Sequence, residues 1–81
     1  MKAKVYISYK DGILDPKGKT TGNALKAMGI KGIKDVTIGK YIEISFGKVT
    51  GKDARSITIE SCEKLLANPN IETYTFKIEE N

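Results

Sequence analysis

Apolar and polar side chains alternate along the first ten positions of the chain, and this two-residue period is typical of a β-strand with one buried face. Val5, Ile7 and Tyr9 share one face of residues 3–10, and the other face is mostly polar. An Asp-Gly pair, which favours a turn, ends the alternation. We therefore predict a strand over residues 3–10 whose odd-numbered face lies in the core.

The residues that follow carry the signals of a helix. Asp15 offers a carboxylate to the free backbone N–H groups of a first turn, and the fixed φ of Pro16 suits the first helical position. An apolar face follows at helical spacing, formed by Ala24, Leu25 and Met28. Gly29 is placed to end the helix in a left-handed cap. Gly18 and Gly22 weaken the helix relative to Ala, so we expect another segment to pack closely against them.

Residues 35–46 are ambiguous between one strand and two. Their even-numbered positions are apolar except for Lys40, namely Val36, Ile38, Ile42, Ile44 and Phe46. A two-residue turn at Gly39-Lys40 would place the apolar positions of its two arms on opposite faces. Either a three-residue turn from Gly39 to Tyr41 or one long strand bent by a bulge at the glycine fits the pattern. We favour two strands.

A second helix and a last strand complete the pattern. Thr50 and Asp53 match a capping box at the helix start. The predicted inward stripe of this helix consists of Ala54, Ile57, Ser61, Cys62 and Leu65. Asn68 and Pro69 stop the helix, and alternation resumes in the last strand. Its predicted inner face is Tyr74, Phe76 and Ile78.

The order of these elements is β-α-β-β-α-β, which is the split ferredoxin-like pattern. We therefore predict an α+β fold in which residues 1–81 form a single domain. Its architecture would be a two-layer sandwich, with an antiparallel sheet that carries both helices on one face. A chain of 81 residues buries only about 60% of its unfolded surface, so we also expect an oligomer.

Composition and charge narrow the possible partners. The net charge of +4 is uneven, because residues 1–40 carry nine Lys against three Asp and residues 41–81 carry five basic against seven acidic groups. The lysines are scattered singly and the chain has one Arg, so we expect solvated surface and no nucleic-acid partner. No apolar run approaches the ~20 residues of a membrane span. The N-terminus also lacks the apolar core of a signal peptide, so we expect a cytoplasmic protein without a membrane partner.

Residues that could perform catalysis are scarce. The chain has no His, so imidazole general-base catalysis and His-ligated metal sites are excluded. Cys62 is the single cysteine, and its place on the predicted inward stripe favours a buried apolar role. Asp11 and Asp15 are explained by a turn and a helix cap. We therefore predict no catalytic residue, no metal site and no cofactor bound by this chain.

Three phrases of the sequence together resemble one family. They are Leu14-Asp15-Pro16-x-Gly18, Val36-x-Ile38-Gly39-Lys40-Tyr41-Ile42-Glu43 and Cys62-Glu63-Lys64-Leu65-Leu66-Ala67-Asn68-Pro69-x-Ile71-Glu72. Their order and spacing are similar to those of the PurS family, the small subunits of phosphoribosylformylglycinamidine synthase. The resemblance spans nearly the whole chain.

The resemblance implies a non-catalytic structural subunit of an enzyme of de novo purine synthesis. That enzyme converts formylglycinamide ribonucleotide, ATP and glutamine-derived ammonia into the amidine, and it uses ATP and Mg²⁺. The implied partners are a large ATP-binding synthetase subunit, a glutaminase subunit and further copies of this chain, as a homodimer or a dimer of dimers. The implied interface residues are Asp15, Pro16, Gly39, Lys40, Tyr41, Asn68 and Pro69.

Two other classes share this topology. An RNA-binding module of the RNA-recognition-motif type needs exposed aromatic residues on neighbouring strands, which Tyr6 and Tyr41 could supply. Glu43, however, shares the face of Tyr41 and would repel phosphate. A ligand-binding regulatory domain of the ACT type would use a glycine in the first strand-to-helix loop, where Gly12 stands.

Overall fold

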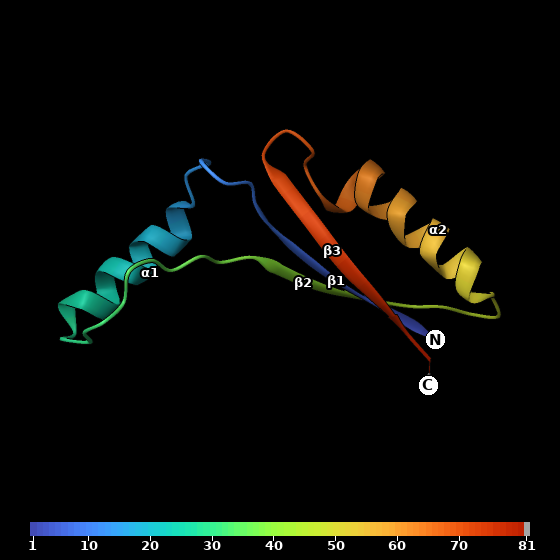
Figure 1. Ribbon diagram of the computed structural model, residues 1–81, viewed down its shortest axis with the longest axis horizontal. Helices are drawn as coiled ribbons and strands as arrows, with labels where there is room; N and C mark the ends of the chain where they lie inside the picture. Colours follow the sequence, from blue (N-terminus) through green and yellow to red (C-terminus); the bar gives the residue numbers. More distant parts are fainter. Residues whose placement is uncertain (81) are drawn as a thin grey trace.

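The computed structural model describes residues 1–80 and contains three strands and two α-helices in that range. The strands are β1 (Lys2–Tyr9), β2 (Lys40–Ser45) and β3 (Glu72–Glu79). The α-helices are α1 (Pro16–Ala27) and α2 (Gly51–Ser61), and a π-helical turn, η1 (Cys62–Leu66), follows α2 directly. All strand pairs are antiparallel in the order β2-β1-β3, so β1 lies at the centre of the sheet (Figure 1).

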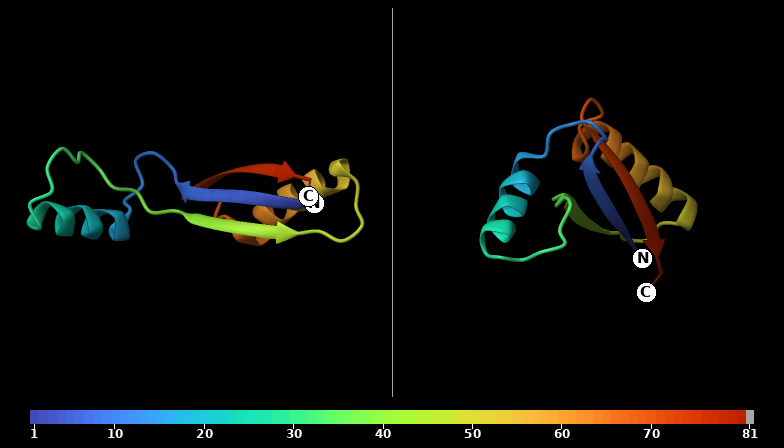
Figure 2. Two further views of the ribbon diagram at one scale, coloured as in Figure 1. Left: turned by 90° about the horizontal axis from the view of Figure 1, so that it is seen from below. Right: turned by 60° about the vertical axis from the view of Figure 1, so that its left-hand side comes forward.

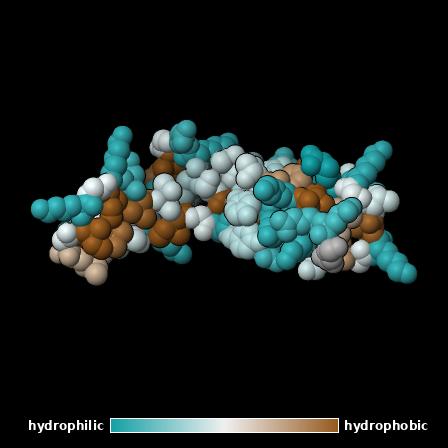
Figure 3. All heavy atoms as spheres, turned by 60° about the horizontal axis from the view of Figure 1, so that its bottom comes forward, coloured by the Kyte–Doolittle hydropathy of each residue, from teal (hydrophilic) through white to brown (hydrophobic). Residues whose placement is uncertain are grey.

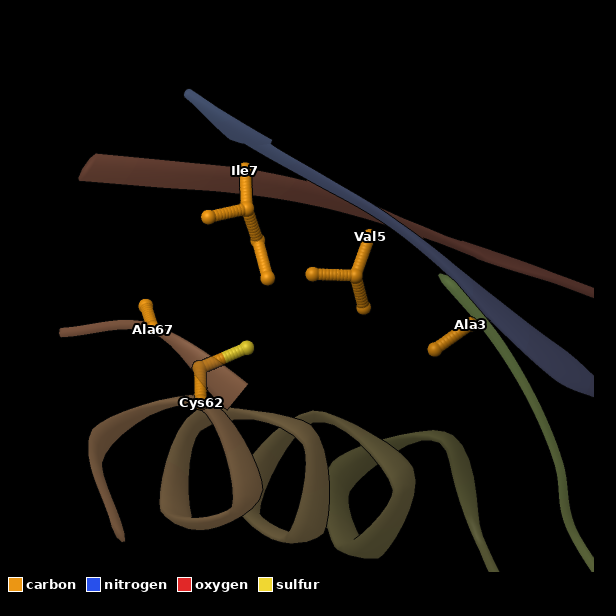
Figure 4. Packing of buried hydrophobic residues seen from close by; sticks show 5 residues of the cluster. All are labelled: Ala3, Val5, Ile7, Cys62 and Ala67. Carbon is orange, nitrogen blue, oxygen red and sulfur yellow. The ribbon is translucent and has the colours of Figure 1, made fainter. Parts of the chain in front are cut away.

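The core lies between this sheet and α2. The predicted alternation of the first strand is confirmed, because Ala3, Val5 and Ile7 are buried. Their side chains point toward Cys62 and Ala67 at the end of the helical segment (Figure 4). Most of these residues are small, so a single chain encloses a thin core.

The buried stripe of α2 differs from the predicted one. Ala54 and Cys62 are buried as expected, but Thr58 occupies the position between them and Ile57 is 40% exposed. The Thr58 hydroxyl donates a hydrogen bond of 2.7 Å to the Ala54 carbonyl, so it needs no partner in the core. A hydrophobicity pattern counts threonine as polar and therefore misses this burial.

The π-helical turn η1 explains a second difference. The Ala67 N–H donates to the Cys62 carbonyl five residues earlier, at 3.0 Å, so this turn holds one more residue than an α-helical turn. The extra residue shifts the helical phase. Leu66 packs against the core, whereas Leu65, predicted to face inward, is 82% exposed.

The helix α1 projects beyond one end of the sheet and covers neither face of it (Figures 1 and 2). The molecule measures 50 × 29 × 14 Å and has a radius of gyration of 16.1 Å. A compact domain of this length has about 12 Å. Within one chain, therefore, the predicted arrangement with both helices on one sheet face is not seen.

The chain returns from α1 to the sheet without a hairpin. Residues 28–39 lead back along α1 and continue directly into β2, which begins at Lys40 (Figure 1). The two strands that we favoured for residues 35–46 are therefore one strand with an unpaired extension before it. We call residues 16–38 the α1 arm.

The α+β class, the antiparallel sheet and the two helices are confirmed, while the described sheet has three strands instead of four. The caps predicted for both helices are present. Asp15 caps α1, Gly29 follows it with a φ of +84°, and the Thr50 side chain accepts a hydrogen bond from the Asp53 N–H. No helix among residues 1–80 is long and apolar enough to span a membrane.

Candidate functional site

Asp15 joins the α1 arm to the sheet end. Its Oδ1 accepts a hydrogen bond of 2.8 Å from the Gly18 N–H, which caps α1. Its Oδ2 accepts one of 2.7 Å from the Ile38 N–H, at the other end of the arm. Both bonds lower the pKa of the Asp15 carboxyl, and the bond from Ile38 has the larger effect. One carboxylate thus closes the arm into a loop.

Glycines allow backbone segments to touch at this junction. A Cβ at Gly18 would collide with the backbone oxygen of Val36, and a Cβ at Gly39 would collide with that of Ile7. At Gly22 a Cβ would lie 3.6 Å from the Val36 side chain, which is ordinary contact. The close packing predicted at Gly18 and Gly22 is confirmed, and its partner is the returning segment of the arm.

Polar contacts link all three strands at the sheet end nearest the arm. Lys40 Nζ lies 3.6 Å from Glu72 Oε2, and Glu72 Oε1 accepts a hydrogen bond of 2.7 Å from the Asn68 N–H. Lys10 Nζ donates to the Pro69 carbonyl at 2.6 Å. The Glu72 side chain is only 10% exposed, so it anchors this network, while Lys40 is 60% exposed.

Two tyrosines stand together on the sheet face opposite α2. Tyr6 and Tyr41 are paired residues of β1 and β2, and their ring centroids are 5.1 Å apart. The Tyr41 hydroxyl donates to Glu43 Oε2 at 2.6 Å. This hydrogen bond is the main cause that raises the pKa of Tyr41 to about 12, and it also lowers the pKa of Glu43. Both rings are about half exposed.

A shallow depression of about 340 Å³ lies beside these rings. Its polar lining comes from hydroxyl-bearing residues of the neighbouring strands, Ser8, Thr73 and Thr75. Aromatic rings with hydroxyl groups are typical of protein interfaces, because they offer apolar area together with hydrogen-bonding groups. For RNA, by contrast, the arrangement is poor. The two rings pack against each other, and the Glu43 carboxylate bonded to the Tyr41 hydroxyl places a negative charge beside them, which opposes phosphate.

The seven residues predicted as interface residues fall into three places. Asp15, Pro16, Gly39 and Lys40 lie where the arm meets the sheet, Asn68 and Pro69 lie at the same sheet end before β3, and Tyr41 lies on the open sheet face. Each except Pro16 and Tyr41 also has a visible role in holding the fold. Their contacts with other subunits remain a prediction.

One chain leaves part of its apolar surface uncovered. Within β2, Ile42 and Ile44 face the α2 side of the sheet but are only half-buried. The exposed apolar residues of the arm are Met28, Ile30 and Ile38, and those of α2 and η1 are Ile57, Ile59 and Leu65. Figure 3 shows apolar side chains gathered over the arm, with long polar side chains around them. The apolar parity of residues 36–46 is the sequence signal of this surface.

Candidate catalytic groups are as scarce in the fold as in the sequence. Cys62 is buried, and burial raises the pKa of its thiol, which opposes formation of a reactive thiolate. No group of three metal-ligating side chains converges among residues 1–80. What the described surface offers is contact area.

Comparisons with known proteins agree on one family. The family model described as PurS, phosphoribosylformylglycinamidine (FGAM) synthase, matches residues 2–80. The PurS subunit of this synthase from Bacillus subtilis is 44% identical over 79 residues, which are 98% of this chain and 93% of that protein.

Solved structures are similar over nearly the same length. The crystal structure of Methanocaldococcus jannaschii PurS matches with a TM-score of 0.88 and 38% identity, covering 99% of this chain and 96% of that one. A chain in the structure of PurLQS from Thermotoga maritima matches with a TM-score of 0.85 and 28% identity, covering 94% and 93%. That relative is therefore found in a multi-subunit assembly.

Proposed function

The chain belongs to the PurS family, and we propose on this basis that it acts as the non-catalytic subunit that holds the other subunits of phosphoribosylformylglycinamidine synthase in place. This synthase is a ligase of purine biosynthesis. In the proposed assembly a large synthetase subunit binds ATP, Mg²⁺ and formylglycinamide ribonucleotide, and a glutaminase subunit releases ammonia. The present chain binds no cofactor and works in the cytoplasm.

The observation that carries this proposal is the excess surface of the single chain. Its accessible surface is 6119 Å², whereas a compact protein of 8.9 kDa exposes about 4,800 Å². The difference of about 1,300 Å² per chain, doubled in a symmetric pair, reaches the range of obligate interfaces. A subunit with this much uncovered surface and no catalytic group is suited to bind other chains.

The free edge of β2 supports a homodimer in which two arms are exchanged. The Phe46 N–H donates to the Met1 carbonyl, so the even-numbered residues of β2 bond to β1 and the odd-numbered ones direct their backbone groups outward. In the proposed dimer these groups pair with the partner's unpaired arm segment, across a two-fold axis near Gly39 and Lys40. Each half would then hold four strands and two helices.

The apolar surface fits this exchange. In this pairing even-numbered residues of one chain lie opposite even-numbered residues of the other and point to the same sheet face. The partner's Val36 and Ile38 would therefore extend the apolar row of Ile42 and Ile44. The partner's α1 would cover the gap beside α2. Residues 16–34 carry five Lys and no acidic residue, whereas α2 and η1 carry three basic and three acidic residues, so charge does not oppose the contact. The four-strand ferredoxin-like arrangement predicted from the sequence would thus be completed by two chains.

Two measurements test the dimer. Sedimentation equilibrium at micromolar concentration should give twice the mass of one chain, and a stable monomer would contradict the proposal. Arm exchange is tested by isotope-filtered NMR on a mixture of labelled and unlabelled chains. Methyl contacts between Val36 and Ile44 should then appear only between chains, and a dimer without them would rule out the exchange.

Reconstitution tests the role in the synthase. The isolated chain should neither hydrolyse glutamine nor consume ATP. The large subunit and the glutaminase should form the amidine from glutamine only when this chain is added, while the large subunit with free ammonia should need it less. Glutamine-dependent activity at full rate without the chain would refute the proposed role.

A further inference from the structure

The outer edge of β3 is open along its whole length. The eight residues of β3 pair with β1 in an unbroken register from Lys2 opposite Glu79 to Tyr9 opposite Glu72. No strand or helix of residues 1–80 pairs with the other side of β3. Eight residues are a long edge, since most strands have about five or six.

The register identifies the backbone groups that face outward. The Lys10 N–H donates to the Ile71 carbonyl at 2.8 Å, and bonded and non-bonded pairs alternate along an antiparallel ladder. Residues 73, 75 and 77 therefore bond to β1. Tyr74, Phe76 and Ile78 direct their N–H and carbonyl groups to the open side.

This edge carries little of the usual protection against pairing. Natural sheets blunt free edges with proline, bulges or charges, because an open edge pairs with any extended chain. The segment from Glu72 to Glu79 contains no proline and no bulge, and its single charge between the two terminal carboxylates is the exposed Lys77. Its terminal carboxylates point back over the sheet, where Glu79 pairs with Lys4 at 3.1 Å and Glu72 with Lys40 at 3.6 Å. An edge kept open in this way is suited to bind a strand.

We propose that the outer edge of β3 binds an extended strand from another subunit of the synthase. This proposal rests on the role in the synthase proposed above. Backbone pairing at this edge requires an extended polypeptide. The half-buried side chains of Tyr74, Phe76 and Ile78 form an apolar row on the α2 side, so the incoming strand carries apolar residues on that side. On the opposite face it carries polar residues, with an acidic side chain near Lys77.

A second copy of this chain is the wrong occupant for a geometric reason. The proposed homodimer already uses the β2 edge of each sheet. If β3 also paired with β3 of a further copy, each chain would make two different two-fold contacts along one sheet. Unless the sheet curled into a closed barrel, such contacts would continue from copy to copy and give a ribbon instead of a finite particle. A strand from a different chain ends the sheet.

Backbone amide exchange tests the proposal residue by residue. In the free dimer the amides of residues 73, 75 and 77 should be protected, and those of Tyr74, Phe76 and Ile78 should exchange at least about a hundredfold faster. When exchange is carried out in the complex with the large and glutaminase subunits, the amides of Tyr74, Phe76 and Ile78 should also be protected. Fast exchange of that set in the formed complex would overturn the proposal. Concentration-dependent protection in the free chain would identify a second copy as the occupant and overturn it as well.

A backbone substitution supplies a second test. Cys62 allows a synthetic peptide of residues 62–81 to be ligated to a recombinant fragment, so Phe76 can carry an N-methyl group with its side chain unchanged. The methyl group blocks only the outward N–H. We expect an intact homodimer by sedimentation and binding to the other subunits at least tenfold weaker than for the unmodified ligated chain. Equal binding would overturn the proposal, whereas an unmodified chain that binds neither subunit would refute the role in the synthase itself.

Discussion

The Asp15 carboxylate accepts a hydrogen bond of 2.7 Å from the backbone N–H of Ile38, twenty-three residues later in the chain. The same carboxylate caps α1 through the Gly18 N–H. The start of the helix and the end of the returning segment are therefore held by one side chain. Loss of either bond changes where the α1 arm points, and through the arm it affects any partner that the arm contacts.

Two substitutions separate the two bonds of Asp15. Asp15→Ser keeps an oxygen that can cap α1 but cannot reach Ile38 as well, whereas Asp15→Ala loses both bonds. We expect Asp15→Ala to lower the melting temperature by about 5 °C and Asp15→Ser by less. Homodimer formation, measured by sedimentation, should weaken in both variants. A dimer of unchanged affinity in Asp15→Ala would show that the arm does not contribute to the interface.

Stability should also depend on pH through Asp15. Its folded pKa lies below its ordinary value because of the Ile38 and Gly18 N–H groups, so the folded state binds the proton less tightly than the unfolded state. The stabilisation is complete above the unfolded pKa, near 4, and is lost as pH falls through the lower folded pKa. Urea unfolding between neutral pH and about pH 3 should show a smaller loss for Asp15→Ser than for the wild type. Parallel curves would contradict this assignment.

Two glycines of α1 should respond to alanine in opposite ways. At Gly18 the new Cβ meets the backbone oxygen of Val36, which cannot move away without displacing the arm. We expect a loss of about 1–3 kcal/mol. At Gly22 the nearest atom is a Val36 methyl at 3.6 Å, so alanine fits and should stabilise by about 0.5–1 kcal/mol. Chemical denaturation measures both, and equal effects would disprove the close approach at Gly18.

Tyr41 should matter more for assembly than for folding. Its ring is about half exposed, so Tyr41→Thr should leave the melting temperature within a few degrees. If the ring is a central contact, binding to the other synthase subunits should fall roughly thirtyfold. Tyr41→Phe keeps the ring and removes only the bond to Glu43, so it should bind nearly as the wild type. Wild-type affinity for Tyr41→Thr would remove Tyr41 from the interface.

The Cys62 thiol should be unreactive in the folded protein. It is fully buried, and burial raises its pKa, so the thiolate is scarce and shielded. Alkylation by iodoacetamide should be at least about a hundredfold slower in buffer than in urea. Exposed Leu65 provides a matched control, because Leu65→Cys in a Cys62→Ala chain should react at the rate of a free thiol. Rapid alkylation of native Cys62 would show that the core opens readily.

Local patterns predicted the elements well because their causes are local. The parity of Val5 and Ile7, the Asp15 cap and the Gly29 stop each depend on a few neighbouring residues, and all are present in the structure. The prediction that α1 packs on the sheet of its own chain was wrong for the opposite reason. The apolar residues of a helix indicate that it must be covered, but they do not indicate whether the covering surface belongs to the same chain.

Two further differences arise from hydrogen bonds that a hydropathy pattern cannot contain. Thr58 is buried because its hydroxyl is satisfied by its own helix. Residues 35–39 do not form a hairpin strand because Asp15 holds Ile38 and Gly39 passes directly over Ile7. Four of the candidate interface residues, Asp15, Pro16, Gly39 and Lys40, lie at the junction of arm and sheet, whereas nothing in the sequence indicated that Glu72 anchors it.

The π-helical turn η1 also sets the phase of everything that follows it. A helix repeats every 3.6 residues and a strand every two, so one residue more or less between them exchanges the two faces of β3. Deleting one residue from Cys62–Leu66 would restore a regular helix, and if β3 shifted by that residue it would turn Tyr74, Phe76 and Ile78 to solvent and their threonine neighbours inward. A change of length in this turn therefore endangers the core, although the side chains of the turn are mostly exposed.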